Sequence, residues 1–276
     1  MLDRGLVKQM EQLGWTVQCP PFDSFSALAP KEELVFKNCR NVRHVAQVTE
    51  HVYKSVRSAL EKKHVALTLG GDHSLGIGTV AGTLSVYPNA GVIWVDAHAD
   101  INTVDDTESG NLHGCPVSFL MGLGTKLEPF SWVKPSLHPS RIVYVGLRDV
   151  DKDEKRLLKE HGILAFSMHH VDKFGIAGVM EKALAHLGDS PIHLSFDVDA
   201  LDPSVAPATG TPVRGGLTFR EGHYVCEAIA ETGRMVSLDI MEVNPSLGKD
   251  ELSLTQTVEV LIVDLGWQFA DSCGNG

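Results

Sequence analysis

Three short segments of the chain carry acidic and imidazole side chains at spacings that suit metal binding. They are Gly70-Gly-Asp-His73-Ser74, Asp96-Ala-His98-Ala-Asp100 and Asp197-Val-Asp199. With Asp72 left out, they supply two imidazoles and four carboxylates, a donor set for two hard divalent cations that share a bridging oxygen. Because a bridged metal pair makes a hydroxide at neutral pH, this pattern predicts a hydrolase whose nucleophile is metal-bound water.

The grouping of these carboxylates is more informative than any one of them. A single buried Asp or His is usually a hydrogen-bonded core group. Several carboxylates at the edge of an apolar sheet repel one another and lose their hydration, and bound cations remove that cost. A carboxylate-rich site without thiolates suits Mn²⁺ or Mg²⁺ better than structural Zn²⁺. Two imidazoles favour Mn²⁺ over Mg²⁺, with iron or cobalt as further options.

Apolar runs typical of β-strands precede the polar segments. They cover His64–Leu69, Gly91–Val95, Ile142–Val145, Ile192–Phe196 and Met235–Met241. Most are almost continuously apolar, as expected for strands buried on both faces of a parallel sheet. Helical patterns also occur, namely Leu6–Trp15, an apolar stripe over residues 41–60, a capping box Thr218-Phe-Arg-Glu221 and a stripe over residues 254–269. The alternation predicts an α/β fold, a three-layer α/β/α arrangement with a mostly parallel sheet.

Every polar cluster in the chain follows one of these strands. The clusters are Gly70–Ser74, Asp96–Asp100, Arg148–Asp151, Asp197–Asp199 and Glu242–Asn244. In open α/β sheets, ligands bind outside the carboxyl ends of the strands, so we expect the clusters to share one site there. Two long loops, 105–114 and 202–216, are expected to take part in function, because loops of this length are uncommon in a compact domain.

Composition narrows the class of protein. The chain has 276 residues, 43% of them hydrophobic and 21% charged, and a formal net charge of −11. That charge argues against nucleic acid or an anionic membrane as a partner, since phosphate binding needs a basic face. The five cysteines form no CxxC pair, which indicates free thiols. No signal peptide or membrane-length apolar run is present, so we expect a cytoplasmic protein, or a mitochondrial one if a longer form carries a transit peptide.

Several stretches together resemble the arginases of the ureohydrolase family. They are Leu69-Gly-Gly-Asp-His-Ser74, Trp94-Val-Asp-Ala-His-Ala-Asp-Ile-Asn102, Ser109-Gly-Asn-Leu-His-Gly114, Gly146-Leu-Arg-Asp-Val-Asp151, Ser195-Phe-Asp-Val-Asp199, Ala208-Thr-Gly-Thr-Pro212 and Leu238-Asp-Ile-Met-Glu-Val-Asn-Pro245. They occur in the family's order, and the Ser-Gly-Asn-Leu-His-Gly loop is particular to arginases. The resemblance implies a binuclear Mn²⁺ site and hydrolysis of L-arginine to L-ornithine and urea by a metal-bridging hydroxide.

The resemblance also assigns the metal ligands. The first metal would be held by His73, Asp96, Asp100 and Asp197, and the second by His98 and Asp199, with Asp96 and Asp197 bridging the two. Asp100 would also accept a proton from the hydroxide, and His113 would carry protons to the leaving amine or to solvent. Such roles suit the substrate, because a guanidinium is a poor electrophile and its leaving nitrogen needs a proton.

The remaining assignments concern L-arginine itself. Glu242 would hold the guanidinium, because a carboxylate matches its fork of N–H donors. The α-carboxylate would be bound by Asn102, Ser109 and Asn111, the α-ammonium by Asp151 and more weakly Glu154, and Thr211 would line the site. Asp72 is expected to orient the ligands.

The ends of the chain depart from the family pattern. We expect one catalytic domain over residues 1–276, truncated at the N-terminus, where the usual first strand is lacking, and shortened at the C-terminus. Loss of an interior strand would leave two neighbouring strands with unpaired backbone groups. The family forms homotrimers, which such ends would weaken.

Two alternatives stay open from the sequence alone. One is a sister amidinohydrolase acting on agmatine, which has no carboxylate for Asn102, Ser109 and Asn111 to bind. The other is an inactive relative that modulates partner subunits.

Overall fold

A parallel β-sheet forms the centre of the protein in the computed structural model, which describes Leu2, residues 5–19, 25–248, Asp250, residues 254–255 and Thr257. The six strands are β1 (Ala66–Leu69), β2 (Gly91–Val95), β3 (Ile142–Leu147), β4 (Leu164–Ser167), β5 (Ile192–Asp197) and β6 (Met235–Met241). They lie in the order β1-β6-β5-β2-β3-β4, and each pairing between them is parallel.

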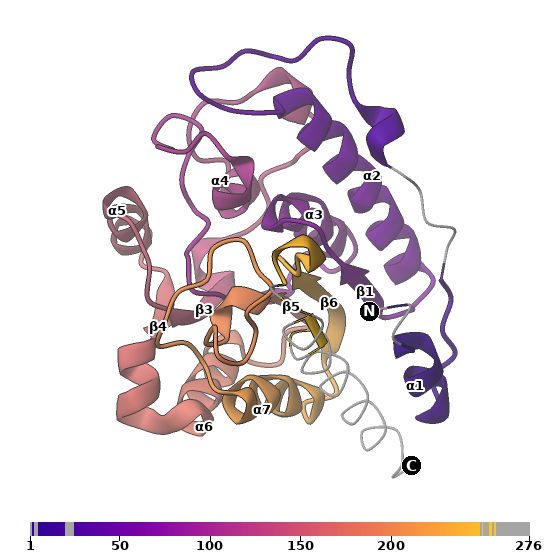
Figure 1. Cartoon of the computed structure of the whole chain (residues 1–276), viewed down its shortest axis with the longest axis vertical. Coiled ribbons are helices and arrows are strands. Elements are labelled where there is room, and N and C mark those ends of the chain that lie inside the picture. The colour runs from indigo at the N-terminus through magenta and orange to yellow at the C-terminus, as the bar shows by residue number, and fades with distance from the viewer. Residues whose placement is uncertain are drawn as a thin grey trace.

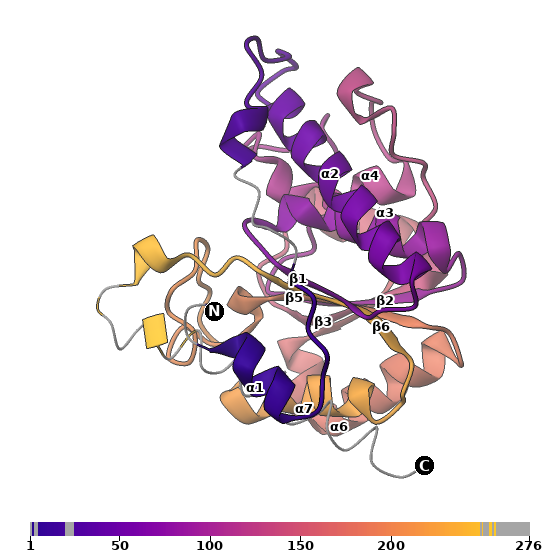
Figure 2. The same ribbon diagram turned by 90° about the vertical axis from the view of Figure 1, so that its right-hand side faces the viewer.

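Helices cover both faces of this sheet, as Figure 1 and Figure 2 show. One face carries α2 (Val42–Glu61), α3 (Gly76–Val86) and α4 (Pro116–Met121), and the other carries α1 (Leu6–Gln12), α6 (Met168–Leu187) and α7 (Phe219–Ala230). The short helix α5 (Lys152–Glu160) follows β3. This three-layer α/β/α arrangement confirms the predicted fold class. None of the described helices is both long and apolar enough to cross a membrane.

The central strands are apolar on both faces because both faces are covered. In β2, Val92 and Trp94 pack in a cluster with α3 and α4, while Ile93 and Val95 pack in a cluster with α6 and α7. All four side chains are fully buried. The period of two in a strand therefore explains why the run is continuously apolar in sequence.

Strands β5 and β6 differ, because only one of their faces is apolar. Leu194, Phe196, Leu238 and Ile240 pack on the α6 and α7 side. The opposite face carries buried polar side chains, namely His193, Ser195, Ser237 and Asp239. This polar face lies toward α3, directly behind the carboxyl ends of the strands.

Most predicted elements are confirmed, with shifts of a few residues. β2 and β6 have the predicted bounds, and α2 and the capping box of α7 at Thr218 are present. α1 ends earlier than predicted, before Gly14, which has a left-handed φ of 91°. The four-residue strand β4 at the sheet edge was not predicted. The predicted C-terminal helix over 254–269 lies almost wholly outside the described residues.

The expectation of two unpaired interior strands is wrong for the described part of the sheet. The strands form one continuous sheet in which β1 is at an edge and pairs with β6. The described strands therefore contain no interior gap, and only the outer edges of β1 and β4 lack a neighbouring strand among them.

Candidate metal centre and substrate pocket

The predicted metal ligands meet because of the strand order. β1, β6, β5 and β2 are consecutive neighbours in the sheet, and being parallel they end on the same side. His73 follows β1, Asp96 follows β2, Asp197 ends β5 and Glu242 follows β6. Residues separated by more than a hundred positions in sequence are thus brought to one edge of the sheet.

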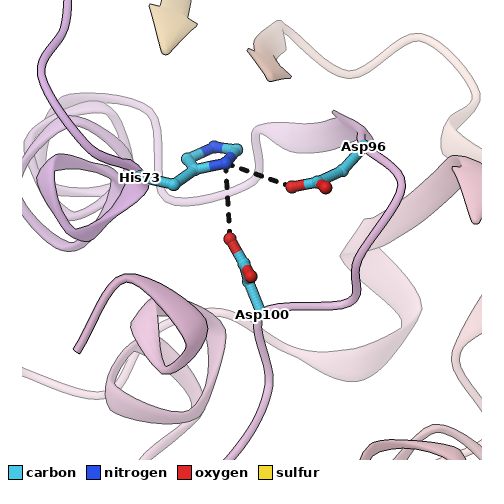
Figure 3. A group of neighbouring side chains, drawn as sticks. All are labelled: His73, Asp96 and Asp100. Carbon is cyan, nitrogen blue, oxygen red and sulfur yellow. Dashed lines mark ion pairs between the residues drawn. The ribbon is translucent and has the colours of Figure 1, made fainter. Parts of the chain in front are cut away.

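One imidazole nitrogen lies at the centre of the first ligand group. The Nδ1 atom of His73 is 3.0 Å from Asp197 Oδ2, 3.1 Å from Asp96 Oδ2 and 3.3 Å from Asp100 Oδ2. Figure 3 shows the carboxylates of Asp96 and Asp100 converging on the His73 ring. His73 and Asp96 are at most 1% exposed, so the group is shielded from bulk water.

A second group forms around His98 and shares a carboxylate with the first. His98 Nδ1 is 3.1 Å from Asp199 Oδ2 and 3.4 Å from Asp96 Oδ1. Asp96 therefore has one oxygen directed at each group, which is the arrangement of a ligand that bridges two ions. His98 Nε2 lies 3.8 Å from Asp149 Oδ2, at the more open side of the cluster.

The charges of the cluster fit bound divalent cations. The potential ligand atoms of His73, Asp96 and Asp100 lie within 4.8 Å of one another, as do those of Asp96, His98 and Asp199. Burial and the neighbouring carboxylates raise the pKa of Asp100 and Asp197 well above the usual range, and raise that of Asp199 as well. Cations would relieve this repulsion and replace the protons that the carboxylates otherwise need.

The same carboxylates also raise the pKa values of the two imidazoles, because they stabilise the charged imidazolium form. Burial disfavours the imidazolium of His73, but the hydrogen bond to Asp96 and the charge of Asp100 outweigh it and raise the pKa to about 9. Burial is likewise outweighed at His98, where Asp199 and Asp96 raise the pKa to about 12. Without cations, these rings therefore hold protons where ions would otherwise balance the carboxylates.

Local turns orient the acidic ligands. Asp96 Oδ1 accepts a hydrogen bond from the backbone N–H of His98 at 2.7 Å, and Asp197 Oδ1 accepts one from Asp199 at 2.8 Å. These are Asx turns, in which an Asp binds the backbone two residues onward. In both segments the Asp side chain accepts from the backbone N–H two residues onward, and this turn directs each strand end toward the cluster.

Two non-glycine residues at the site have left-handed backbone conformations. Asp100 has a φ of 50° and Glu242 a φ of 64°. Asp100 is held by its carbonyl, which accepts from Val117 N, and Glu242 by its N–H, which donates to the carbonyl of Gly71. Such conformations are costly for L-residues and concentrate at functional sites.

His113 and Glu242 form a pair beside the cluster. His113 Nδ1 is 3.3 Å from Glu242 Oε1, and this same oxygen accepts the backbone N–H of His73 at 2.9 Å. The hydrogen bond to Glu242 raises the pKa of His113. Burial opposes the charge of Glu242, but the hydrogen bonds from His113 and from His73 N outweigh it and lower the pKa. Each partner therefore favours the charged form of the other.

A cavity of about 200 Å³ opens over the cluster. Of the residues predicted to bind substrate, Asn102, Asp151, Glu154 and Thr211 line it, together with His98, Asp100, His113 and Glu242. Asn102 Nδ2 donates to Asp151 Oδ2 at 2.7 Å, and Thr211 Oγ1 donates to Asp199 Oδ2 at 2.9 Å.

The other predicted substrate binders lie elsewhere. Asn111 lines a neighbouring cavity, which shares His113 with the first, and the exposed Ser109 lines neither. The oxygens of Glu154 accept backbone N–H groups of Asp151 and Ile101, which ties helix α5 to the loop after β2. Asp72 accepts hydrogen bonds from the N–H and Oγ of Ser74, so it caps the turn that carries His73.

Sequence reasoning gave no role to Arg148 and Asp149, although both lie in a polar cluster that it singled out. Asp149 lines the cavity. Arg148 Nη2 donates to the carbonyl oxygens of Asp199 at 2.6 Å and of Val213 at 2.7 Å, and Nη1 donates to that of Ala200 at 3.1 Å. Arg148 thereby joins the turn that carries Asp199 to the loop after it. In the sequence, the position of Arg148 and Asp149 directly after a predicted strand was the available signal.

The chain is similar to known arginases in sequence and in structure. The model of the Arginase family matches residues 8–268. The arginase of Glaciozyma antarctica is 56% identical over 269 residues, which are 94% of this chain and 78% of that protein. The arginase of Saccharomyces cerevisiae is 45% identical over 280 residues, covering 94% and 84%.

Among solved structures, an arginase matches the chain better than an agmatinase does. The native structure of arginase from Bacillus caldovelox matches with a TM-score of 0.87 and 36% identity, covering 100% of this chain and 90% of that one. A hypothetical agmatinase from Burkholderia thailandensis matches less well, with a TM-score of 0.66, 25% identity and coverages of 85% and 68%.

Proposed function

The chain belongs to the arginase family, and from this premise we propose that its His and Asp cluster holds two manganese ions beside a pocket for L-arginine. It hydrolyses the guanidinium group of L-arginine to give L-ornithine and urea. The observation that carries the site assignment is the shared carboxylate of Asp96, which has an oxygen in each of two ligand groups. Members of both groups line the same cavity.

The donor set supports manganese as the metal. His73, Asp96, Asp100 and Asp197 would hold the first ion, and His98 with Asp199, Asp96 and Asp197 the second. Carboxylates with two imidazoles and no thiolate match the ligand preference of Mn²⁺. When bound, such a pair supplies the Lewis acidity that makes water a nucleophile at neutral pH.

At the reacting end, the chain contributes binding and proton transfer. Glu242 is a carboxylate whose pKa is lowered, so it can accept N–H groups of the substrate guanidinium. Asp100, which lines the cavity beside Glu242 and His113, can accept a proton from the attacking water. His113, which hydrogen-bonds to Glu242 and lines the cavity, gives a proton to the leaving nitrogen.

At the outer end, polar side chains match a free amino acid. Asn102 can donate to the α-carboxylate, and Asp151, which it already contacts, can accept from the α-ammonium. Agmatine has no carboxylate, so this arrangement favours L-arginine. Ser109 and Asn111 remain predictions as carboxylate binders, since Asn111 lines the neighbouring cavity and Ser109 lines neither.

Two broader features complete the proposal. The protein assembles with further copies of itself, as a trimer by analogy with the family, and it acts in the cytoplasm. Both follow from the family resemblance and the composition, and sedimentation and fractionation measure them directly.

A urea-release assay tests the proposed function. Purified protein loaded with Mn²⁺ should release urea from L-arginine and do so far faster than from agmatine, whereas metal-free protein should be inactive. Equal rates on the two substrates would overturn the substrate assignment. Full activity after complete removal of metal would overturn the metal centre.

A further inference from the structure

A second group of buried polar side chains lies behind the metal centre and has no part in the mechanism above. Asp239 on β6 and His193 on β5 are both fully buried, and His193 Nε2 is 2.8 Å from Asp239 Oδ2. The same oxygen accepts Thr79 Oγ1 of α3 at 2.5 Å and Ser195 Oγ at 3.4 Å. A carboxylate is costly to bury, so its presence in this core needs a purpose.

Ser195 joins this buried carboxylate to a predicted metal ligand. Ser195 Oγ is 2.8 Å from His73 Nε2, on the side of the ring opposite to the Nδ1 atom that faces the carboxylates. The result is a chain of contacts from Asp239 through Ser195 and His73 to the cluster. It forms because β5 and β6 are neighbours, with Ser195 paired in register with Asp239.

The direction of the hydrogen bonds follows from the donors available. A carboxylate only accepts, so the contact between Ser195 and Asp239 uses the one hydroxyl proton of Ser195. Ser195 Oγ must then accept from His73, which places a proton on His73 Nε2. A neutral His73 with that proton has its lone pair on Nδ1, the atom that lies among Asp96, Asp100 and Asp197.

A stacked ring fixes the plane of the same imidazole. The rings of His73 and Trp94 are 4.1 Å apart between centroids with an angle of 10° between planes. Trp94 Nε1 also donates to Asp96 Oδ2 at 3.0 Å, so its ring is held in place. With the ring plane set by Trp94, the remaining variable is which nitrogen carries the proton.

We propose that Asp239, acting through Ser195, is a positioning residue that fixes the tautomer of His73 with Nδ1 free to bind the first metal. The inference rests on the metal site of the proposed function. Groups that hydrogen-bond to metal-binding histidines in this way set the ring's orientation and raise its basicity, and losing them typically weakens metal binding by roughly 10–100-fold.

The test compares Asp239→Asn with Ser237→Ala. Asn keeps the size of Asp but can donate from its amide, so Ser195 no longer has to give its proton to residue 239 and the tautomer of His73 is released. Ser237 is buried on the same face of β6, and its Oγ has no hydrogen-bond partner among the described residues. We expect Asp239→Asn to weaken binding of the tighter Mn²⁺ by roughly 10–100-fold, and Ser237→Ala to leave it unchanged.

A spectroscopic readout separates positioning from loss of structure. In protein labelled with ¹⁵N-histidine and loaded with diamagnetic Mg²⁺, the wild type should show a His73 ring protonated at Nε2. Ser195→Ala, which leaves Asp239 and His193 in contact, should weaken metal binding and alter that signal. It provides the decisive comparison if Asp239→Asn does not fold.

The outcomes also separate this inference from the proposed function. A wild-type protein that binds no Mn²⁺ contradicts the metal site itself. Two tightly bound ions in the wild type, with unchanged affinity and an unchanged His73 signal in Asp239→Asn and Ser195→Ala, contradict only the role of Asp239.

Discussion

The two ends of the pocket are built in different ways. At the metal end, the ligands come from the ends of neighbouring strands, and His73, Asp96, Asp197 and Asp199 are at most 2% exposed. At the outer end, the predicted substrate binders lie on loops and at a helix N-terminus, where Ser109 and Asp151 are exposed. Their mutual contacts are few and local: Asn102 Nδ2 donates to Asp151 Oδ2, Glu154 accepts the backbone N–H of Asp151, and Ser109 Oγ accepts that of Asn111.

This difference suggests that the metal end carries out the reaction and that the outer end selects the substrate. Side chains on a packed sheet are held in fixed geometry by several neighbours, whereas side chains on loops adjust more easily. A change at the metal end should therefore abolish the reaction, and a change at the outer end should alter which substrate is preferred.

The largest effect is expected at the shared carboxylate. Asp96→Ala removes an oxygen from both ligand groups and leaves His73 and His98 without a common partner. Bound Mn²⁺ and urea release should both fall to background, as elemental analysis and a urea assay would show. Asp189→Ala, at an exposed residue before the opposite end of β5, provides a control that should keep its metal. Retention of two ions in Asp96→Ala would end the bridging role.

A smaller loss of activity is expected when a proton-transfer residue is removed and the metal is kept. His113→Ala should lower kcat by roughly 10²–10⁴-fold, the usual contribution of general acid catalysis, with unchanged metal content. Exposed His64 offers a control, since His64→Ala should behave as wild type. A fully active His113→Ala would remove this residue from the mechanism.

Metal binding should also depend on pH in a known direction. In the metal-free protein the pKa of His73 is about 9, because hydrogen bonding to Asp96 and the charge of Asp100 outweigh burial. The metal needs the neutral ring, so protons compete below this pKa and Mn²⁺ affinity should rise by up to about tenfold per pH unit toward pH 9. Calorimetry in buffers of different ionisation enthalpy should record proton release. An affinity independent of pH would contradict the competition of a proton and the metal ion for Nδ1 of His73.

The smallest effects are expected at the outer end. Asn102→Ala should raise KM for L-arginine by roughly tenfold, the lower end of the range for one hydrogen bond to a charged group, and leave agmatine unaffected. Ser109→Ala should have a smaller effect, because Ser109 lies outside the cavity. Equal losses in the two variants would show that the loop closes over the substrate and would weaken the division between the two ends.

The metal end could be predicted from the sequence because its signals are local. Asp96, His98 and Asp100 are two residues apart and follow an apolar run, and that pattern alone placed them at a strand end. The strand β4 gave no such signal, since it is short and only partly buried. The sequence also could not tell that Ser109 would lie outside the cavity, because a loop's path depends on packing between distant elements.

The contacts behind the site were equally hidden from the sequence. Ser195 and Asp239 are 44 residues apart, and they meet only because β5 and β6 are adjacent in register. Arg148 reaches Val213 across 65 residues for a similar reason, since the loop after β5 folds back over the end of β3. Strand order is set by tertiary packing, so neither contact could be read from spacing.

The most direct measurement is anomalous diffraction at the manganese edge from crystals grown with Mn²⁺. We expect two peaks, one beside Nδ1 of His73 and the other beside Nδ1 of His98, with the carboxylate of Asp96 between them. A map without peaks among these side chains, from protein that releases urea from L-arginine, would contradict the two-metal site.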